Sequence, residues 1–270
     1  MPELPEVETT VRGLRRLLDG RVLTRVEPRR ADLRRAIPAD LRQRLTGARV
    51  TGLGRRAKYG LIDTDRGDTL IFHLGMSGRW RVDPPEIGKH DHLLVETEEG
   101  RSLTLHDPRR FGSLDLVASD SLQSFAPFAA LGPEPLGPDL TAAYLAASFA
   151  GRIAPIKPLL LDQRIVAGLG NIYVCEALNI AGIAPGRPAG GLSRGRLERL
   201  VPAIREVLEA AIAAGGSTLR DFAQPDGELG YFASQFRVYG REGETCRCGS
   251  IVRRRVDGGR STFYCSRCQH

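Results

Sequence analysis

The sequence predicts an α+β multidomain protein with a β-rich N-terminal part, a helical part and a small C-terminal metal-binding module. Short apolar runs of β type, interrupted by Gly and Pro, occupy residues 21–118. Segments with helical apolar spacing follow from residue 142 onward. Four of the five cysteines then lie between residues 246 and 268. Because 270 residues are enough for two or three domains, we interpret these changes of pattern as domain changes.

The N-terminal part is expected to be a helix followed by a β-sandwich or barrel. Apolar side chains recur at helical spacing from Val7 to Leu18, which predicts a helix over residues 4–18 that stops before Gly20. The strands expected after it are 21–26, 70–74, 93–97, 103–105 and 114–117. Glu99-Gly100 is typical of a hairpin turn between two of these strands.

A segment rich in Pro and Gly at residues 131–138 marks a boundary before the helical part. The helices expected after it are 142–149, 157–166, 171–178 and 197–212. Ser193 can cap the last of these, with Pro202 close to its first turn. Residues 215–230 are rich in Gly and have little regularity. The domains are therefore predicted at residues 1–130, 131–235 and 236–270.

The net charge of +7 is compatible with a polyanionic partner. Of the 39 basic residues, only Lys58, Lys89 and Lys157 are lysines, and a retained lysine can mark a position that needs a titratable amine or a compact charge. No apolar run approaches the ~20 residues of a membrane helix. Residues 1–6 are acidic where a signal peptide is basic, so we expect a cytoplasmic protein.

The C-terminal cysteines form two short pairs, C-x-C and C-x-x-C, separated by residues 249–264. The candidate metal ligands are Cys246, Cys248, Cys265 and Cys268. Four thiolates in two pairs suit one closed, structural Zn²⁺ site, and a metal-free hairpin is the alternative. The first pair is one residue short, which strains the usual knuckle. The segment is also rich in arginine, so the hairpin could contact phosphate, or the metal could simply stabilise a tail too small to fold alone.

The N-terminus carries a possible nucleophile. Removal of Met1 would leave Pro2 with a free secondary amine, and α-amino groups have pKa values near 8, so part of it is neutral at pH 7. Such an amine can attack a sugar C1′ and form an iminium. Glu3 and Glu6, adjacent and one helical turn away, could then act as general acids or bases. The alternative is structural, since Pro and acidic residues are common in the first turn of any helix.

The motifs taken together resemble those of formamidopyrimidine-DNA glycosylases. The matching segments, in family order along the chain, are residues 2–9 (PELPEVET), 55–59 (RRAKY), 73–78 (HLGMSG), 89–92 (KHDH), 107–112 (DPRRFG), 156–158 (IKP), 168–173 (GLGNIY), 215–219 (GGSTL) and 259–265 (GRSTFYC). Each motif alone is weak, but the ordered set extends over the whole chain. The resemblance implies an N-terminal β-sandwich, a helix–two-turn–helix domain and a C-terminal zinc finger, with double-stranded DNA as partner.

The resemblance also implies catalytic roles. Pro2 would form a Schiff base at C1′ of the damaged nucleotide and displace the base, with Glu3 as acid or base on the sugar side. Lys58 and Arg260 match the proton donors or phosphate contacts of the β- and δ-elimination steps. The shortened Cys246–Cys248 pair departs from the family pattern and bears on the position of Arg260.

Further positions match the family's DNA contacts. The predicted DNA-binding residues are His73, Met76, His90, Arg109, Phe111, Arg152, Lys157 and Asn171, with Arg152 in place of a family lysine. Met76, Arg109 and Phe111 match a wedge that fills the gap left when a damaged base leaves the stack. Without the resemblance, Met76 and Phe111 would be interpreted as core residues. Residues 216–231 match a loop that covers the everted purine.

The implied function is that of a bacterial DNA-repair glycosylase and AP lyase, acting as a monomer at the nucleoid, that removes oxidised purines such as 8-oxoguanine and formamidopyrimidines. One alternative is the endonuclease VIII-type branch, which prefers oxidised pyrimidines and begins with a different peptide. Another is a non-catalytic protein that binds damaged DNA, which would have no use for this N-terminus. A zinc-dependent nuclease would need an open metal site, whereas four thiolates favour a closed one.

Overall fold

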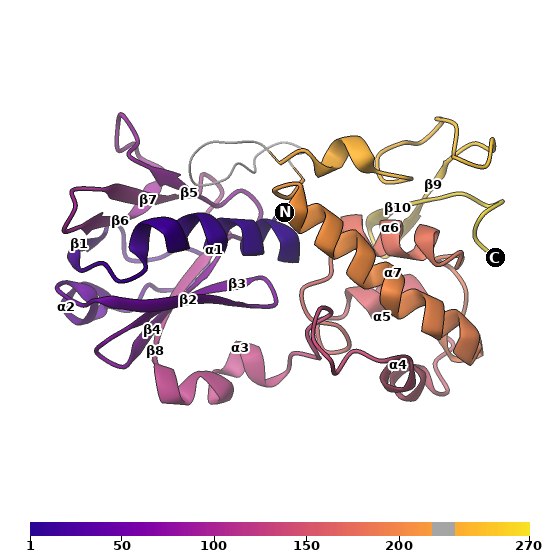
Figure 1. Cartoon of the computed structure of the whole chain (residues 1–270), viewed down its shortest axis with the longest axis horizontal. Helices are drawn as coiled ribbons and strands as arrows, with labels where there is room; N and C mark the ends of the chain where they lie inside the picture. Colours follow the sequence, from indigo (N-terminus) through magenta and orange to yellow (C-terminus); the bar gives the residue numbers. More distant parts are fainter. Residues whose placement is uncertain (218–229) are drawn as a thin grey trace. The chain divides into compact units, whose positions relative to one another are not determined.

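The computed structural model describes residues 1–217 and 230–270, which fall into two units (Figure 1). Unit 1 consists of residues 1–129 and 214–231, and unit 2 of residues 130–213 and 232–270. The predicted division into three domains is a different one and stays a prediction. In the part of the chain so described, no helix is both long enough and apolar enough to span a bilayer.

Unit 1 is an N-terminal helix combined with two antiparallel four-stranded sheets. Its elements are α1 (Leu4–Leu18), β1 (Leu23–Pro28), α2 (Leu41–Leu45), β2 (Val50–Arg56), β3 (Tyr59–Thr64), β4 (Asp68–His73), β5 (Arg79–Val82), β6 (Asp91–Thr97), β7 (Ser102–His106), β8 (Ser113–Ala118), η1 (Ser119–Ser124) and α3 (Ala126–Ala129). One sheet has the strand order β1-β6-β7-β5, and the other β2-β3-β4-β8.

The two sheets share one apolar core with a face of α1, which makes unit 1 a β-sandwich. Phe72 of β4 and Trp80 of β5, from different sheets, meet with ring centroids 5.5 Å apart. Gly60 of β3 lies against the Phe72 ring, where an added Cβ would come within 2.1 Å of a ring carbon. Buried side chains of α1, from Val7 to Leu18, complete the core. The predicted fold class is therefore confirmed.

Most expected elements of unit 1 are present, and α1 has the predicted bounds. The five expected strands correspond to β1, β4, β6, β7 and β8. At the predicted turn between β6 and β7, Gly100 has a φ of 78° and its N–H donates to the Thr97 carbonyl at 2.9 Å. Strands β2, β3 and β5 were not predicted, because Gly interrupts the apolar pattern of β2 and β3, and β5 is only four residues long.

Unit 2 is a helical bundle that carries a β-hairpin. Its elements are α4 (Ala142–Phe149), α5 (Ile156–Leu161), α6 (Asn171–Ile180), η2 (Ala189–Gly191), α7 (Arg194–Ala213), η3 (Phe232–Gln235), β9 (Arg253–Asp257) and β10 (Arg260–Tyr264). Helix α6 packs against α5, α7 and β10, so it is the central element of the unit. Its buried Glu176 accepts hydrogen bonds from the backbone N–H groups of Arg237, Val238 and Tyr239 at 2.8–3.0 Å, which fixes the segment leading to the cysteines.

Two expectations for the helices of unit 2 were wrong. Helix α5 ends at Leu161 rather than at residue 166, because Asp162 leaves the helix and its carboxylate accepts from the N–H of Arg164 at 3.0 Å. Pro202 lies inside α7, in its third turn, and not near its start. Buried apolar side chains on both sides, Leu200 and Ile204, keep this helix continuous despite the missing N–H of Pro202.

The shared core of unit 1 yields a stability prediction. Phe72→Ala is expected to lower the free energy of unfolding by about 3–5 kcal/mol, because it leaves a cavity between the sheets. The surface variant Ile87→Ala is the control, since Ile87 is 40% exposed. Urea unfolding followed by the fluorescence of Trp80, the one tryptophan of the sequence, reports on this unit. Equal unfolding midpoints for the two variants would contradict the prediction.

Candidate active site and metal centre

The start of α1 holds the candidate nucleophile beside two buried carboxylates. Pro2 is buried, and Glu3 and Glu6 are 3% and 2% exposed. Glu3 is the N-cap of α1 and Glu6 lies three residues later, the spacing of a capping box. The N–H of Glu3 donates to Oε2 of Glu6 at 2.9 Å. This local hydrogen bonding places Glu3 next to Pro2 with little freedom to move.

Glu6 also fixes a distant segment of unit 1. Its Oε1 accepts hydrogen bonds from both N and Oγ of Ser217, each at 2.9 Å. Further along, the N–H of Tyr231 donates to the carbonyl of Ala214 at 3.0 Å. Both ends of the predicted lesion loop are thus held together, while its residues 218–229 lie outside the described part of the chain. The sequence analysis did not anticipate the Glu6–Ser217 contact, which joins positions 211 residues apart.

Lys58 lies in the turn between β2 and β3 and is only 7% exposed. Ala57 beside it has a left-handed φ of 52°. The guanidinium of Arg55 donates to the Ala57 carbonyl at 2.8 Å and pairs with Glu8 of α1 at 3.1 Å. The turn that carries Lys58 is therefore tied to the same helix that Glu3 caps.

His73 is a neutral ring in this site. Burial foremost, and then the positive charge of Lys58, lower the pKa of His73 to about 4. Its Nδ1 accepts from the N–H of Gly75 at 3.0 Å, a bond that requires an unprotonated nitrogen. His73 thus shapes the turn that follows β4, and the positive charge of Lys58 adds to the effect of burial on its pKa.

The three residues of the predicted wedge are exposed on loops of unit 1. Met76 is 38% and Phe111 44% exposed, so the alternative interpretation of both as core residues is wrong. The guanidinium carbon of Arg109 lies 4.8 Å from the centroid of the Phe111 ring, a cation–π distance. Exposed apolar side chains stacked with a guanidinium are suited to enter a gap between stacked bases.

His90 and Arg152 lie on separate units. The His90 ring contacts the rings of His92 and His106, with centroids 6.4 and 5.9 Å away. Its neighbour Asp91 is buried and accepts from the N–H of Gly88 at 2.7 Å, which orders the loop before β6. Arg152 is exposed after α4 in unit 2.

In unit 2, Lys157 and Asn171 both bind the hairpin. Lys157 is fully buried, and its Nζ donates to the Ser261 carbonyl at 3.1 Å and to Oγ1 of Thr262 at 2.7 Å. Asn171 donates from Nδ2 to the same Ser261 carbonyl at 2.9 Å. Burial lowers the pKa of Lys157. Two helix-start residues thereby fix the backbone next to Arg260, and their predicted contact with DNA phosphate stays a prediction.

Arg260 is exposed at the start of β10, directly after the turn of the hairpin. Gly258 and Gly259 form this turn with φ values of 55° and 75°, the left-handed pair that a tight hairpin needs. Oγ1 of Thr262 donates to Oδ2 of Asp257 across the two strands at 2.5 Å. The hairpin is consequently ordered on both sides of Arg260.

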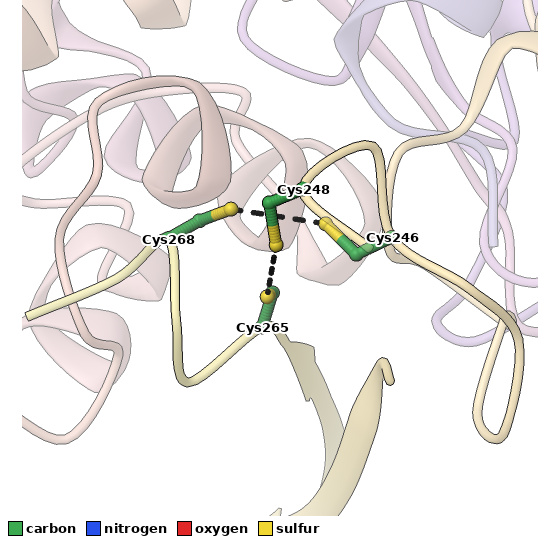
Figure 2. A group of neighbouring side chains, drawn as sticks. All are labelled: Cys246, Cys248, Cys265 and Cys268. Atoms are coloured by element: carbon green, nitrogen blue, oxygen red, sulfur yellow. Dashed lines mark hydrogen bonds between the residues drawn. The ribbon is translucent and has the colours of Figure 1, made fainter. Parts of the chain in front are cut away.

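The four predicted metal ligands converge (Figure 2). Their sulfur atoms lie within 4.8 Å of one another, with Cys246–Cys268 at 3.8 Å and Cys248–Cys265 at 3.5 Å. Tetrahedral Zn–S bonds of about 2.3 Å correspond to sulfur separations of about 3.8 Å. The residues present therefore fit a four-thiolate metal site.

The short first pair is accommodated by a tight turn. The N–H of Cys246 donates to the Ser250 carbonyl at 2.7 Å, and Gly249 adopts a φ of 83°. In the second pair, burial raises the pKa of Cys265, but N–H donors of Cys268 and Arg267 oppose this and lower it to about 7. The pKa of Cys268 is raised instead, foremost by its hydrogen bond with the Cys248 thiol, so the thiols of the cluster ionise one after another.

Comparisons with known proteins agree over the whole chain. Residues 1–114 match the family model of the formamidopyrimidine-DNA glycosylase N-terminal domain, and residues 131–223 match that of its H2TH domain. The chain is 75% identical to the formamidopyrimidine-DNA glycosylase of Rhizorhabdus wittichii and 70% identical to that of Novosphingobium aromaticivorans, over 100% of each chain.

Solved structures give the same result. The chain is 42% identical to the MutM (Fpg) protein of Thermus thermophilus, with a TM-score of 0.88 over 99% of this chain and 98% of that one. It is 34% identical to Lactococcus lactis Fpg in complex with DNA containing an abasic site, with a TM-score of 0.91 over 100% of both chains.

The effect of the Lys58 charge on His73 predicts a measurable titration. Lys58→Met is expected to raise the pKa of His73 from about 4, because a positive charge is lost, but to leave it below 6.5, because the ring stays buried. Histidine NMR signals followed from pH 3 to 8 would report the change, with Arg12→Met as the control. An unchanged His73 pKa would contradict the assignment.

The lowered pKa of His73 also makes the stability of the folded protein depend on pH. Between pH 6.5 and about 4, the unfolded chain binds a proton at His73 that the folded chain does not. This group is therefore expected to lower the stability as the pH falls through that window.

Proposed function

The chain belongs to the formamidopyrimidine-DNA glycosylase family, and we propose that it excises oxidised purines from duplex DNA and then cleaves the strand at the same site. Membership makes it a DNA glycosylase of base-excision repair. The observation that carries the finer proposal is the arrangement at the start of α1, where Pro2 is followed by the buried carboxylates of Glu3 and Glu6. Chromosomal DNA as substrate would place the enzyme in the bacterial cytoplasm.

Excision would begin with the amine of Pro2, freed by removal of Met1. Its nitrogen lone pair attacks C1′ of the damaged nucleotide, the N–C1′ bond forms, and the glycosidic bond breaks as the base leaves. The C1′–O4′ bond then breaks to give an iminium between Pro2 and C1′, and Glu3 moves the proton that the Pro2 nitrogen gives up to O4′. The hydrogen bonds that Glu6 makes to Glu3 and Ser217 favour a positioning role for Glu6 in this scheme.

Strand cleavage would follow by elimination from the iminium. Loss of a C2′ proton expels the 3′ phosphate in β-elimination, and a second elimination at the 5′ side expels the other phosphate. The buried ammonium of Lys58 and the exposed guanidinium of Arg260 are the cations proposed to assist these departures. A buried cation stabilises a developing phosphate charge more strongly than an exposed one does.

Duplex DNA with an oxidised or abasic site is the proposed partner. Lactococcus lactis Fpg, a structural neighbour, is known in complex with DNA that contains Fapy-dG or an abasic site. The net charge of +7 suits such a polyanion. Met76, Arg109 and Phe111 would fill the vacated stack, and His73, His90 and Arg152 would contribute to binding, together with Lys157 and Asn171.

The C-terminal cysteines are proposed to hold one structural Zn²⁺. Cys246, Cys248, Cys265 and Cys268 supply the four thiolates, which leaves no open position for a catalytic water. When bound, the ion supplies only stability to the hairpin. The role of the site in the reaction would thus be to hold the strand that carries Arg260 in place.

Covalent trapping tests the nucleophile. With a duplex that carries one 8-oxoguanine opposite cytosine, borohydride is expected to link the native protein to DNA, because the reductant converts an iminium into a stable amine. Protein with a blocked N-terminus and the variant Pro2→Gly are compared on the same duplex. A drop of at least ~100-fold in cutting by the blocked protein, with binding retained, is the size expected for a lost nucleophile.

Two results would contradict the proposal. No adduct from native protein that binds this duplex would exclude Pro2 chemistry on this lesion and favour a protein that only binds damaged DNA. An equal adduct from the blocked protein would assign the nucleophile to another amine.

Metal analysis tests the zinc site. The purified protein is expected to contain about one zinc per chain, as a closed four-thiolate site binds a single ion. Cys248→Ser should lose the metal, whereas Cys175→Ser should keep it, because Cys175 is buried in the same apolar cluster but is not one of the four ligands. Native protein without zinc, or equal metal loss in both variants, would contradict the assignment.

A further inference from the structure

Asp107 is a fully buried carboxylate that the catalytic scheme does not use. Its Oδ1 accepts from Oγ of Ser77 at 2.7 Å, and its Oδ2 accepts from the N–H of Gly112 at 2.8 Å. Within residues 1–217 and 230–270, no Lys or Arg forms an ion pair with it. Burial of a carboxylate that only two neutral groups hydrogen-bond costs free energy. We therefore expect this side chain to have a structural or functional role.

Both donors are chain neighbours of the predicted wedge. Ser77 directly follows Met76 in the turn between β4 and β5. Gly112 directly follows Phe111 in the loop between β7 and β8. One carboxylate therefore joins the two loops that present Met76 and Phe111 to solvent.

The two loops meet backbone to backbone. Gly75 has a φ of 62°, and a Cβ added there would lie 2.4 Å from the carbonyl carbon of Phe111. A Cβ on Gly112 would lie 2.7 Å from the carbonyl oxygen of His73 and 3.1 Å from the Asp107 carboxylate. Only glycine fits at these two positions, which means that the loops approach as closely as their backbones permit.

The backbone of Asp107 orders the remaining loop residues. Its carbonyl is 2.8 Å from Nε2 of His92, and burial lowers the pKa of His92, so that a neutral ring donates this hydrogen bond. The N–H of Asp107 donates to the His90 carbonyl at 2.9 Å. Arg110, in the same loop, has a left-handed φ of 57°, and its N–H donates to the Asp107 carbonyl at 3.2 Å. The loop that carries Arg109 and Phe111 is thus held at Asp107, with Arg110 in a strained backbone conformation.

The side-chain hydrogen bonds of Asp107 go to loops and not to strands. Ser77 and Gly112 both lie between strands of unit 1. Removal of the carboxylate would therefore loosen the loops more than it would separate the sheets.

We propose that Asp107 is the positioning residue of the wedge: it holds the Met76 turn and the Arg109–Phe111 loop in one fixed arrangement, ready to enter the gap that a displaced base leaves. The inference rests on the proposed function. Loops that are ordered in advance lose less conformational entropy when they insert into DNA. Asp107 is then needed where a stacked duplex must be opened and filled, and dispensable where no stack exists.

Two substrates distinguish a reaction that needs the wedge from one that does not. A duplex with 8-oxoguanine opposite cytosine needs the wedge, whereas a single-stranded oligonucleotide with a preformed abasic site needs only the Pro2 chemistry. Asp107→Ala is expected to lower excision from the duplex at least about tenfold, the change that 1.4 kcal/mol produces. Borohydride trapping on the single strand should remain at the wild-type level.

A conservative variant provides the matched control. In Asp107→Asn, the side-chain oxygen can still accept from Gly112, and its NH₂ group can donate to the Ser77 hydroxyl, which is also an acceptor. This variant is expected to recover most of the duplex activity. Should Asp107→Ala fail to fold, Ser77→Ala removes one of the two bonds and is expected to give the same split between substrates, with a smaller effect.

A double mutant shows whether Asp107 acts through the wedge. If it positions Met76, the effect of Asp107→Ala on the duplex is expected to be smaller in a Met76→Ala background, because coupled residues are not additive. Additive losses, or equal losses on both substrates in folded protein, would overturn the proposal. Wild-type duplex activity in Asp107→Ala would overturn it as well. A wild-type protein that can be trapped on neither substrate would instead refute the proposed function, and the inference with it.

Discussion

The functional segments of this chain depend on buried carboxylates that accept hydrogen bonds from backbone N–H groups. Glu6 binds N–H groups of Glu3 and Ser217, Asp107 binds that of Gly112, and Glu176 binds those of residues 237–239. Loops have no sheet or helix ladder to satisfy their backbone, and one carboxylate can accept several charge-assisted hydrogen bonds. Each of these side chains therefore orders a segment that regular secondary structure does not.

The interactions that stabilise the fold are therefore different from those that order the segments proposed to act on DNA. The sandwich core of unit 1 and the helices around α6 in unit 2 are held by apolar packing. The residues proposed to act on DNA lie at a helix start, in turns and at a hairpin, where a carboxylate or a glycine fixes the backbone. Exposed side chains such as Met76 and Phe111 can then be rigid without being buried, which lowers the entropic cost of inserting them into DNA.

Two of the three lysines of the chain are buried, and the third is exposed. Lys58 and Lys157 are 7% and 0% exposed, whereas Lys89 is exposed. Lys157 places a compact ammonium between the Ser261 carbonyl and the Thr262 hydroxyl, where the planar fork of an arginine would need more space. In a chain that otherwise uses arginine, two of the three retained lysines are thus buried.

The sequence by itself determined α1, five of the strands, most of the helical part, the C-terminal cysteine cluster and the family, because periodic apolar positions and short motifs depend on neighbouring residues. Tertiary structure decided the rest. Strands β2, β3 and β5 form because they pair with neighbours, despite their weak pattern. The Glu6–Ser217 bond joins residues 211 positions apart, and the Asp107 contacts join loops at the ends of four strands. Such contacts leave no periodic signal in the sequence, since packing of distant segments alone brings their partners together.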